Sequence, residues 1–318
     1  NNSDGGATMI YTVTLNPSID YVMNISSFQE GVVNRASQTM YYPGGKGLNV
    51  SRVLTKLGTS STALGFVAGF TGNFIKEKLL EEQVKEKLIE VEGVSRINVK
   101  LKAKMESEIN GTGPVVSENN IDQLIGQLQS LNEVDIVVLA GSIPNTMPST
   151  IYETLMGVCA KNNVKVVLDT GGETLKKLLD WKPFLIKPNH HELGDLFNVT
   201  IESTDEAIHY AQKVLEQGVE NIIVSMAGDG AILVTKQGTY FAKAPKGVVK
   251  NSVGAGDSLV AGFLAGYSKE KNILHALQNG IAAGSATAFS HDLCEMEEVE
   301  RLLNEVVLQE VILEDNKK

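Results

Sequence analysis

Apolar and polar positions follow two different periods along this chain. From residue 119 onward, stretches with apolar residues three and four positions apart alternate with short apolar runs. The first spacing is typical of amphipathic helices and the second of buried strands. Helices are predicted at residues 120–131, 149–162, 173–179 and 206–217, and strands at 135–140, 164–169, 184–187, 221–225 and 231–234. This alternation predicts an α/β fold with a mostly parallel central sheet covered by helices on both faces.

The first third of the chain follows a different pattern. Residues 9–15 are almost all apolar or β-branched, which predicts a central buried strand. Segments 21–42 and 90–110 alternate instead, and the second carries Arg96, Asn98 and Lys100 on one polar face. We expect these segments to form a small separate sheet attached to a single domain of residues 9–310. The polar, glycine-rich residues 1–8 are expected to be a tag remnant or a disordered tail.

Composition narrows the function more than the fold. The chain has 318 residues, 42% of them hydrophobic, and a net charge of −10. That balance is ordinary for a globular protein and lacks the basic surface that a nucleic-acid binder needs. No apolar run reaches the length of a membrane span, and the two cysteines lie far apart in the sequence. We therefore expect a cytoplasmic protein that binds neither nucleic acid nor membranes.

The segment Asn251–Ser258 (NSVGAGDS) is the strongest candidate for chemistry. It leads into a stretch with helical spacing, so its Gly-Ala-Gly sequence lies at a helix N-terminus, where backbone N–H groups are unpaired and the helix dipole is positive. Such a turn can bind an anion, and Asp257 lies beside it in the first helical turn. Anion donors next to a carboxylate are what phosphoryl transfer to a hydroxyl requires. An ordinary helix start with an acidic first turn is the alternative.

A second glycine-rich turn, Pro43–Gly47 (PGGKG), also leads into a predicted helix. Lys46 and Asn49 lie one helical turn apart and can hold a polyhydroxy or phosphorylated ligand. The spacing is not that of a Walker A loop. Asp20 follows the first predicted strand, at the sheet edge where α/β folds bind ligands, although an Asx-turn would also explain it.

Asn189 and Glu192 lie on one face of a predicted helical turn. Their oxygens could hold Mg²⁺, directly or through water. The same spacing is that of an N-terminal capping box, and the two interpretations are compatible. His190 and His191 have no partner at metal-ligand spacing, so we expect no metal role for them.

Four motifs together resemble the ribokinase-like (PfkB) sugar kinases over nearly the whole chain, from Met9 to about residue 310. They are Asn16–Asp20 (NPSID), Pro43–Val50 (PGGKGLNV), Lys187–Asn189 with Glu192, and Asn251–Ser258. The resemblance implies a ribokinase-like three-layer α/β/α sandwich with a small β-sheet lid. Within the family, Arg96–Lys100 and Glu108–Gly111 are most similar to the phosphosugar kinases, namely the bacterial 1-phosphofructokinases and the tagatose-6-phosphate kinases.

The resemblance also implies roles for individual residues. Asp257 would be the general base, and the amides of Gly254, Ala255 and Gly256 would stabilise the transferring phosphoryl group. The residues that would bind the sugar phosphate are Asp20, Gly44, Gly45, Lys46, Asn49, Arg96 and Asn98. Those that would bind ATP are Lys187, Asn189, Glu192, Ser225, Gly228, Gly230 and Asn279, with Asn189 and Glu192 also holding Mg²⁺. In this family such lids often pair, which implies a homodimer.

The reaction implied is ATP-dependent phosphorylation of a ketohexose phosphate, foremost fructose 1-phosphate to fructose 1,6-bisphosphate. Tagatose 6-phosphate is the alternative acceptor, and a non-catalytic sugar-phosphate-binding protein is the alternative of a different class. A NAD-dependent dehydrogenase is disfavoured because the loop after the first strand is Asn16-Pro17-Ser18, without the GxGxxG turn.

Overall fold

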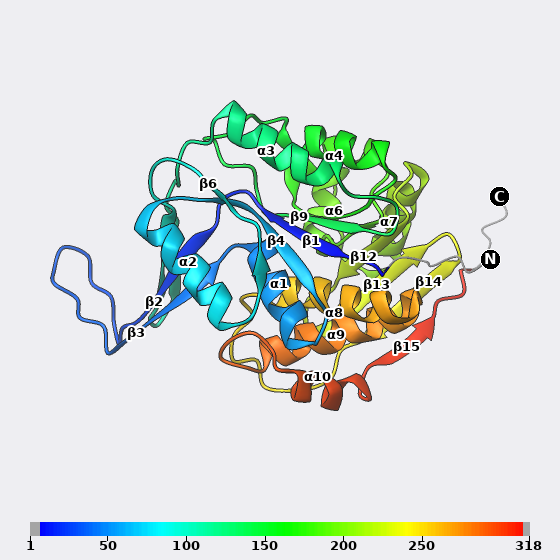
Figure 1. The fold of residues 1–318 in the computed structure, drawn as a ribbon. Helices are drawn as coiled ribbons and strands as arrows, with labels where there is room; N and C mark the ends of the chain where they lie inside the picture. Colours follow the sequence, from blue (N-terminus) through cyan, green and yellow to red (C-terminus); the bar gives the residue numbers. More distant parts are fainter. Residues whose placement is uncertain (1–6, 314–318) are drawn as a thin grey trace.

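Two sheets and ten helices make up the described part of the chain, residues 7–313 of a computed structural model (Figure 1). The helices are α1 (Lys46–Lys56), α2 (Gly69–Glu81), α3 (Glu118–Gln129), α4 (Ile151–Lys161), α5 (Gly172–Leu178), α6 (His190–Leu196), α7 (Thr204–Glu216), α8 (Ala255–Glu270), α9 (Ile273–Ala288) and α10 (Met296–Leu303). The expectation for residues 1–8 falls mostly outside the described residues.

The main sheet has a parallel centre and an antiparallel end. Its strands, in spatial order, are β15 (Val307–Glu310), β14 (Gly238–Lys243), β13 (Ala231–Thr235), β12 (Asn221–Ser225), β11 (Leu185–Ile186), β10 (Lys165–Asp169), β9 (Ile136–Ala140), β1 (Ile10–Thr14), β4 (Ser61–Val67) and β5 (Lys85–Glu86), with β6 (Ile89–Glu90) also pairing with β4. All pairs from β12 to β5 are parallel, and β12 to β15 are antiparallel. The carboxyl ends of β1, β9 and β10 therefore open on the same edge.

Side chains of one strand alternate between the two faces of the sheet, and β9 illustrates the result. Val137 and Leu139 belong to the core under α3 to α7, whereas Ile136 and Val138 belong to the core under α1, α8, α9 and α10. In Figure 1 the first set of helices lies above the sheet and the second below it. This is the predicted three-layer arrangement with a mostly parallel sheet. The sequence pattern did not predict β14, β15 or α10.

The second sheet, here called the lid, consists of β3 (Gln38–Gly44), β2 (Ser18–Asn24), β7 (Arg96–Lys102) and β8 (Glu106–Ile109). It projects from the main body at the left of Figure 1. Arg96, Asn98 and Lys100 share one face and line a cavity, whereas Ile97 on the opposite face is 42% exposed. The polar face of β7 therefore points into the cavity and does not face the solvent, as the polar face of a surface strand usually does.

A buried ion pair holds α1 in place. Arg52, only 3% exposed, donates through Nε and Nη2 to the two carboxylate oxygens of Glu82 at 2.7 and 2.8 Å. Its Nη2 also lies 3.7 Å from Asp292 Oδ2. The two N–H donors of the guanidinium bind both oxygens of the carboxylate, which is a bidentate pair. It ties α1, which carries Lys46 and Asn49, to the end of α2 and to the segment between α9 and α10.

None of the helices within residues 7–313 is both long and apolar enough to cross a membrane.

Candidate active site

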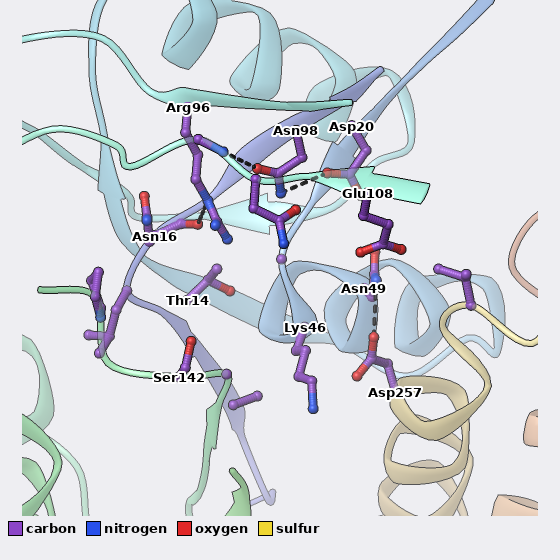
Figure 2. A pocket seen from close by; sticks show the side chains of 18 of the residues that line it. Thr14, Asn16, Asp20, Lys46, Asn49, Arg96, Asn98, Glu108, Ser142 and Asp257 are labelled. Carbon is purple, nitrogen blue, oxygen red and sulfur yellow. Dashed lines mark hydrogen bonds between the residues drawn. The ribbon is translucent and has the colours of Figure 1, made fainter. Parts of the chain in front are cut away.

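The first turns of α1 and α8 meet at one point. Asn49 Nδ2 donates a hydrogen bond to Asp257 Oδ2 at 3.0 Å (Figure 2). Gly254 precedes α8 with φ +81°, a left-handed conformation that glycine adopts without strain. The turn thereby brings the Asp257 carboxylate next to the positive end of the helix.

The amides at this helix end differ in what they contact. The Ala255 N–H donates to Ser252 O at 3.2 Å, whereas the N–H groups of Gly254 and Gly256 have no acceptor within residues 7–313. A Cβ atom on Gly256 would lie 3.1 Å from Lys187 Nζ, so the Lys187 ammonium lies close beside it. The donors available to an anion are therefore Gly254, Gly256 and Lys187, and the Ala255 amide is already paired.

Asp257 is 7% exposed, and its pKa is raised accordingly. Burial, followed by the negative charge of Asp169, raises the pKa of Asp257 to about 6, against the hydrogen bond from Asn49 and the charges of Lys46 and Lys187. With a pKa of about 6 the carboxyl is still mostly ionised at pH 7. Burial, and not the helix dipole, decides the direction of the shift.

Asp169, the last residue of β10, connects two lysines of the site. Its Oδ1 lies 3.4 Å from Lys46 Nζ and 3.8 Å from Lys187 Nζ, while its buried Oδ2 has no hydrogen-bond partner in the described part of the chain. Burial acts to raise the pKa of Asp169, but the two lysines outweigh it and lower the pKa. Sequence reasoning missed this residue. The available signal was its place at the end of a buried apolar strand, the same signal that singled out Asp20.

Asp20 lies within β2 and not in an Asx-turn, and three donors surround it. Ser18 Oγ donates to its Oδ1 at 2.7 Å and Asn98 Nδ2 to the same oxygen at 3.4 Å, while Lys100 Nζ lies 3.4 Å from Oδ2. A Cβ atom on Gly44 would be 2.4 Å from Asp20 Oδ1, so only glycine admits this carboxylate. The Asp20 side chain is thus held in one orientation toward the cavity.

One cavity of about 470 Å³ joins these groups, with Asp257 at one end and Arg96 at the other (Figure 2). The predicted residues that line it are Asp20, Gly45, Lys46, Asn49, Arg96, Asn98, Gly254 and Asp257. Residues that sequence reasoning gave no role here also line it, among them Thr14, Asn16, Lys100 and Ser142. Thr14 is 3% exposed, and its Oγ1 has no hydrogen-bond partner within residues 7–313. Thr14 and Ser142 lie at strand ends, which is the signal that could have found them.

Arg96 reaches the cavity from the first residue of β7. Its Nε donates to the backbone oxygen of Asn16 at 3.0 Å. Burial lowers the pKa of Arg96, against the charge of Asp20, but a guanidinium stays protonated at any physiological pH. A partly buried cation at the far end of the cavity favours an anionic group there.

Asn189 and Glu192 form the capping box of α6. Asn189 Oδ1 accepts from the Glu192 N–H at 2.8 Å, and Glu192 Oε1 accepts from the Asn189 N–H at 3.4 Å. Asn189 also forms an isolated β-bridge to Ser225, which brings two of the predicted ATP-binding residues together. Gly228 is exposed in the next turn, and Gly230, at φ +115°, packs against Ala242 O. None of these residues lines the cavity between Asp257 and Arg96.

No group of three or more acidic, histidine or cysteine side chains at metal-binding distance occurs within residues 7–313. The unpaired Oδ2 of Asp169 is the one buried carboxylate oxygen without a partner in the described part of the chain. Carboxylate and amide oxygens suit Mg²⁺, which keeps several waters and uses few protein ligands. The oxygens of Asp169, Asn189 and Glu192 are of the chemical type that suits a partly hydrated Mg²⁺.

Asn279 lies apart from the other predicted residues. Its Nδ2 donates to His275 O at 2.9 Å, and that nitrogen would lie 2.9 Å from a Cβ atom on Gly266. Gly266 is twelve residues from Gly254, which corresponds to about 18 Å along α8. Asn279 therefore lies away from the end of α8 that carries Asp257, and its role in binding ATP stays a prediction.

The chain is similar to known proteins along most of its length. Residues 13–299 match the pfkB family of carbohydrate kinases. A 1-phosphofructokinase of Bacillus subtilis is 54% identical over 94% of this chain and 98% of its own length. A D-tagatose-1-phosphate kinase of Bacillus licheniformis is 36% identical over 94% of this chain and 98% of its own. The crystal structure of Escherichia coli phosphofructokinase-2 with fructose-6-phosphate superimposes with a TM-score of 0.88 at 26% identity, covering 93% of this chain and 98% of the other.

These relatives transfer a phosphoryl group to a hydroxyl, so the non-catalytic alternative loses its support. The match spans both sheets and includes every motif from Asn16 to Asp257, and the relatives are similar along almost their whole length. The chain belongs to the pfkB family of carbohydrate kinases.

Proposed function

We propose that this enzyme phosphorylates the free primary hydroxyl of fructose 1-phosphate with ATP, giving fructose 1,6-bisphosphate and ADP. The observation that carries this proposal is one cavity with a carboxylate at a helix N-terminus at one end and a guanidinium at the other. A phosphorylated ketohexose has a hydroxyl for the first and a phosphate for the second. Relatives in Bacillus subtilis and Borreliella burgdorferi, 54% and 40% identical, are named 1-phosphofructokinase.

In this mechanism Asp257 accepts the proton of the sugar hydroxyl as that oxygen attacks the γ-phosphorus of ATP. A new oxygen–phosphorus bond forms, and the bond to the β-phosphate oxygen breaks to release ADP. The free N–H groups of Gly254 and Gly256, with Lys187 beside them, would stabilise the charge on the transferring group. Asn49 would hold the Asp257 carboxylate in place for the proton transfer.

The other residues of the cavity would bind and orient the sugar phosphate. Asp20 would accept a hydrogen bond from a sugar hydroxyl, and Arg96 would bind the phosphate. Lys46 is half exposed and contacts Asp169 at 3.4 Å, so it can turn toward either phosphate. Mg²⁺ would neutralise charge on the ATP phosphates, with Asp169, Asn189 and Glu192 as the side chains present to hold it.

The test is a coupled ADP-release assay with Mg²⁺-ATP that compares kcat/KM for fructose 1-phosphate, tagatose 1-phosphate, tagatose 6-phosphate, fructose 6-phosphate and fructose. We expect the largest value for fructose 1-phosphate and the smallest for fructose, which has no phosphate for Arg96. A larger value for fructose 6-phosphate than for fructose 1-phosphate would contradict the proposal.

Tagatose 1-phosphate is the second candidate acceptor. The relative from Bacillus licheniformis, 36% identical along nearly the whole chain, is named for it. The phosphate of this alternative acceptor would be on C1, whereas the resemblance in sequence suggested tagatose 6-phosphate. Fructose and tagatose differ at one hydroxyl, so the same mechanism serves both.

A cytoplasmic location stays a prediction, as does the single-domain organisation of residues 9–310.

The pH dependence of turnover should follow the Asp257 carboxyl. Because only the ionised form accepts a proton, kcat/KM should fall on the acid side, through an apparent pKa of about 6. Substrate phosphates also titrate near pH 6. Asn49→Ala distinguishes titration of Asp257 from titration of the substrate phosphates. It removes the hydrogen bond that lowers the pKa of Asp257, so the acid limb of the profile should move to higher pH. An unmoved limb would assign it to the substrates.

We also propose that two copies pair through the outer faces of their lids. Tyr41, Ile97 and Ile109 are 52, 42 and 62% exposed on the face opposite the cavity. The related Escherichia coli phosphofructokinase-2 has a structure described as a tetrameric inhibited form. Light scattering should give twice the chain mass of 34.2 kDa, and Ile97→Lys combined with Ile109→Lys should return a monomer. A monomeric wild type would contradict this.

A further inference from the structure

Asn16 lies where β1 leads into the lid, and it contacts two separate lid segments. Its side-chain Nδ2 donates to Thr112 O at 3.2 Å, in the loop by which the chain leaves the lid. Its backbone oxygen accepts from Arg96 Nε at 3.0 Å, as Figure 2 shows. One residue therefore holds both the exit loop, residues 110–113, and the cation at the far end of the cavity.

The exit loop is fitted closely to this side chain. Gly113 has φ +78°, and a Cβ atom there would lie 2.2 Å from Asn16 Oδ1, so a larger residue would displace the amide. On its other side the loop is held by Asn98, whose Oδ1 accepts from the Gly111 N–H at 3.1 Å. Asn98 also donates to Asp20 at 3.4 Å. The loop thus connects Asn16 and Arg96 with Asn98 and Asp20, all of which line the cavity.

The contact with Asn16 decides which edge of Arg96 faces the cavity. A guanidinium binds phosphate best through two parallel N–H groups. Because Nε is taken by Asn16 O, the Nη1–Nη2 edge is the pair left for a ligand. Partial burial of Arg96 makes such a pair stronger than it would be in water.

We propose that Asn16 is a positioning residue that determines the preference for a phosphorylated acceptor, by holding the exit loop and thereby the orientation of Arg96. This inference rests on the proposed function of the same cavity. Asn16 itself need not touch the reacting atoms, and its backbone oxygen survives substitution. The contact of its side chain with Thr112 keeps that oxygen and the exit loop in position relative to Arg96.

The first test is Asn16→Ala, measured with fructose 1-phosphate and ATP. We expect KM for the phosphosugar to rise about tenfold, the order of one weakened charge-assisted bond, with kcat and KM for ATP within about twofold of wild type. Gly113→Ala should give the same change in KM, because its methyl group displaces the Asn16 amide from the other side. Asn162→Ala is the matched control, since that amide also donates to a backbone oxygen, Gln129 O at 3.0 Å, but far from the cavity.

A double-mutant cycle separates positioning from general loosening. If Asn16 acts through Arg96, then Asn16→Ala should add less than about twofold to KM in an Arg96→Met background. Independent, multiplying effects of the two substitutions would overturn the inference. Equal losses for KM of the phosphosugar and of ATP would overturn it too, since they would mean a general distortion.

A binding measurement keeps the inference separate from the proposed reaction. Calorimetric titration with inorganic phosphate needs no turnover. We expect Asn16→Ala to raise the dissociation constant for phosphate at least about fivefold relative to wild type and to Asn162→Ala. Equal constants would reject the role of Asn16 even if fructose 1-phosphate is the substrate. An enzyme that binds phosphate through Asn16 and Arg96, but turns over no ketohexose phosphate, would keep the inference and reject the proposed function.

Discussion

Asp257→Asn is expected to lower kcat for the phosphosugar about 10³- to 10⁴-fold, the range of a lost general base. The asparagine keeps the size of the side chain but cannot accept the proton of the attacking hydroxyl. The fold should not suffer. Burial raises the pKa of Asp257 from 3.8 to about 6, so its ionisation lowers the stability of the folded state progressively between these pH values and fully above pH 6. The neutral amide removes this cost.

The measurement is steady-state turnover beside a thermal unfolding curve and an ATP titration. Asp257→Asn should bind ATP within about twofold of wild type and unfold at the same or a higher temperature, because it removes a buried charge. Asp122→Asn, on the exposed surface of α3, is the matched control and should leave turnover unchanged. A loss of less than tenfold in Asp257→Asn would remove the general-base role.

Arg96→Met should lower kcat/KM for fructose 1-phosphate by about 10²-fold, which is the effect expected when a two-bond contact between guanidinium and phosphate is lost. KM for ATP should stay close to wild type, because Arg96 lies at the opposite end of the cavity from Gly254 and Asp257. The preference for fructose 1-phosphate over fructose should shrink by the same factor, since fructose has no phosphate to lose contact with.

Arg96→Lys distinguishes charge from shape. Lysine keeps the positive charge but lacks the planar pair of donors and the Nε bond to Asn16, so it should recover only part of the loss. Arg301→Met is the control, because Arg301 is 58% exposed on α10 and pairs only with Glu298 and Glu305 among the described residues. If Arg96→Met changed kcat/KM for fructose and for fructose 1-phosphate equally, Arg96 would not be the phosphate contact.

Helices and central strands were predictable where the periodicity was long and regular. The predicted strand at residues 135–140 is β9 at Ile136–Ala140, and the predicted helix at 206–217 is α7 at Thr204–Glu216. β14 and β15 were missed because their burial patterns are partly exposed and show no continuous apolar run. Their strand character comes from antiparallel pairing at that end of the sheet, β14 with β13 and β15 with β14.

Part of the site was also predictable from the sequence. The Gly-Ala-Gly turn before Asp257 and the double glycine before Lys46 each predicted a helix N-terminus, and α8 and α1 begin there. For Asn189 the pattern left a capping box and a metal ligand both open. The structure shows the capping box, and the metal role stays a prediction.

The sequence by itself determined the α/β alternation, the helix starts that carry Asn49 and Asp257, and the family, because these depend on local spacing and on motifs along the chain. Only the tertiary structure decided that Asp169 lies between Lys46 and Lys187, that the polar face of β7 points inward, and that Asn16 holds Arg96. It also decided the raised pKa of Asp257. The physical reason is that burial, charge pairing and the orientation of a sheet depend on residues far apart in the chain, which no local pattern records.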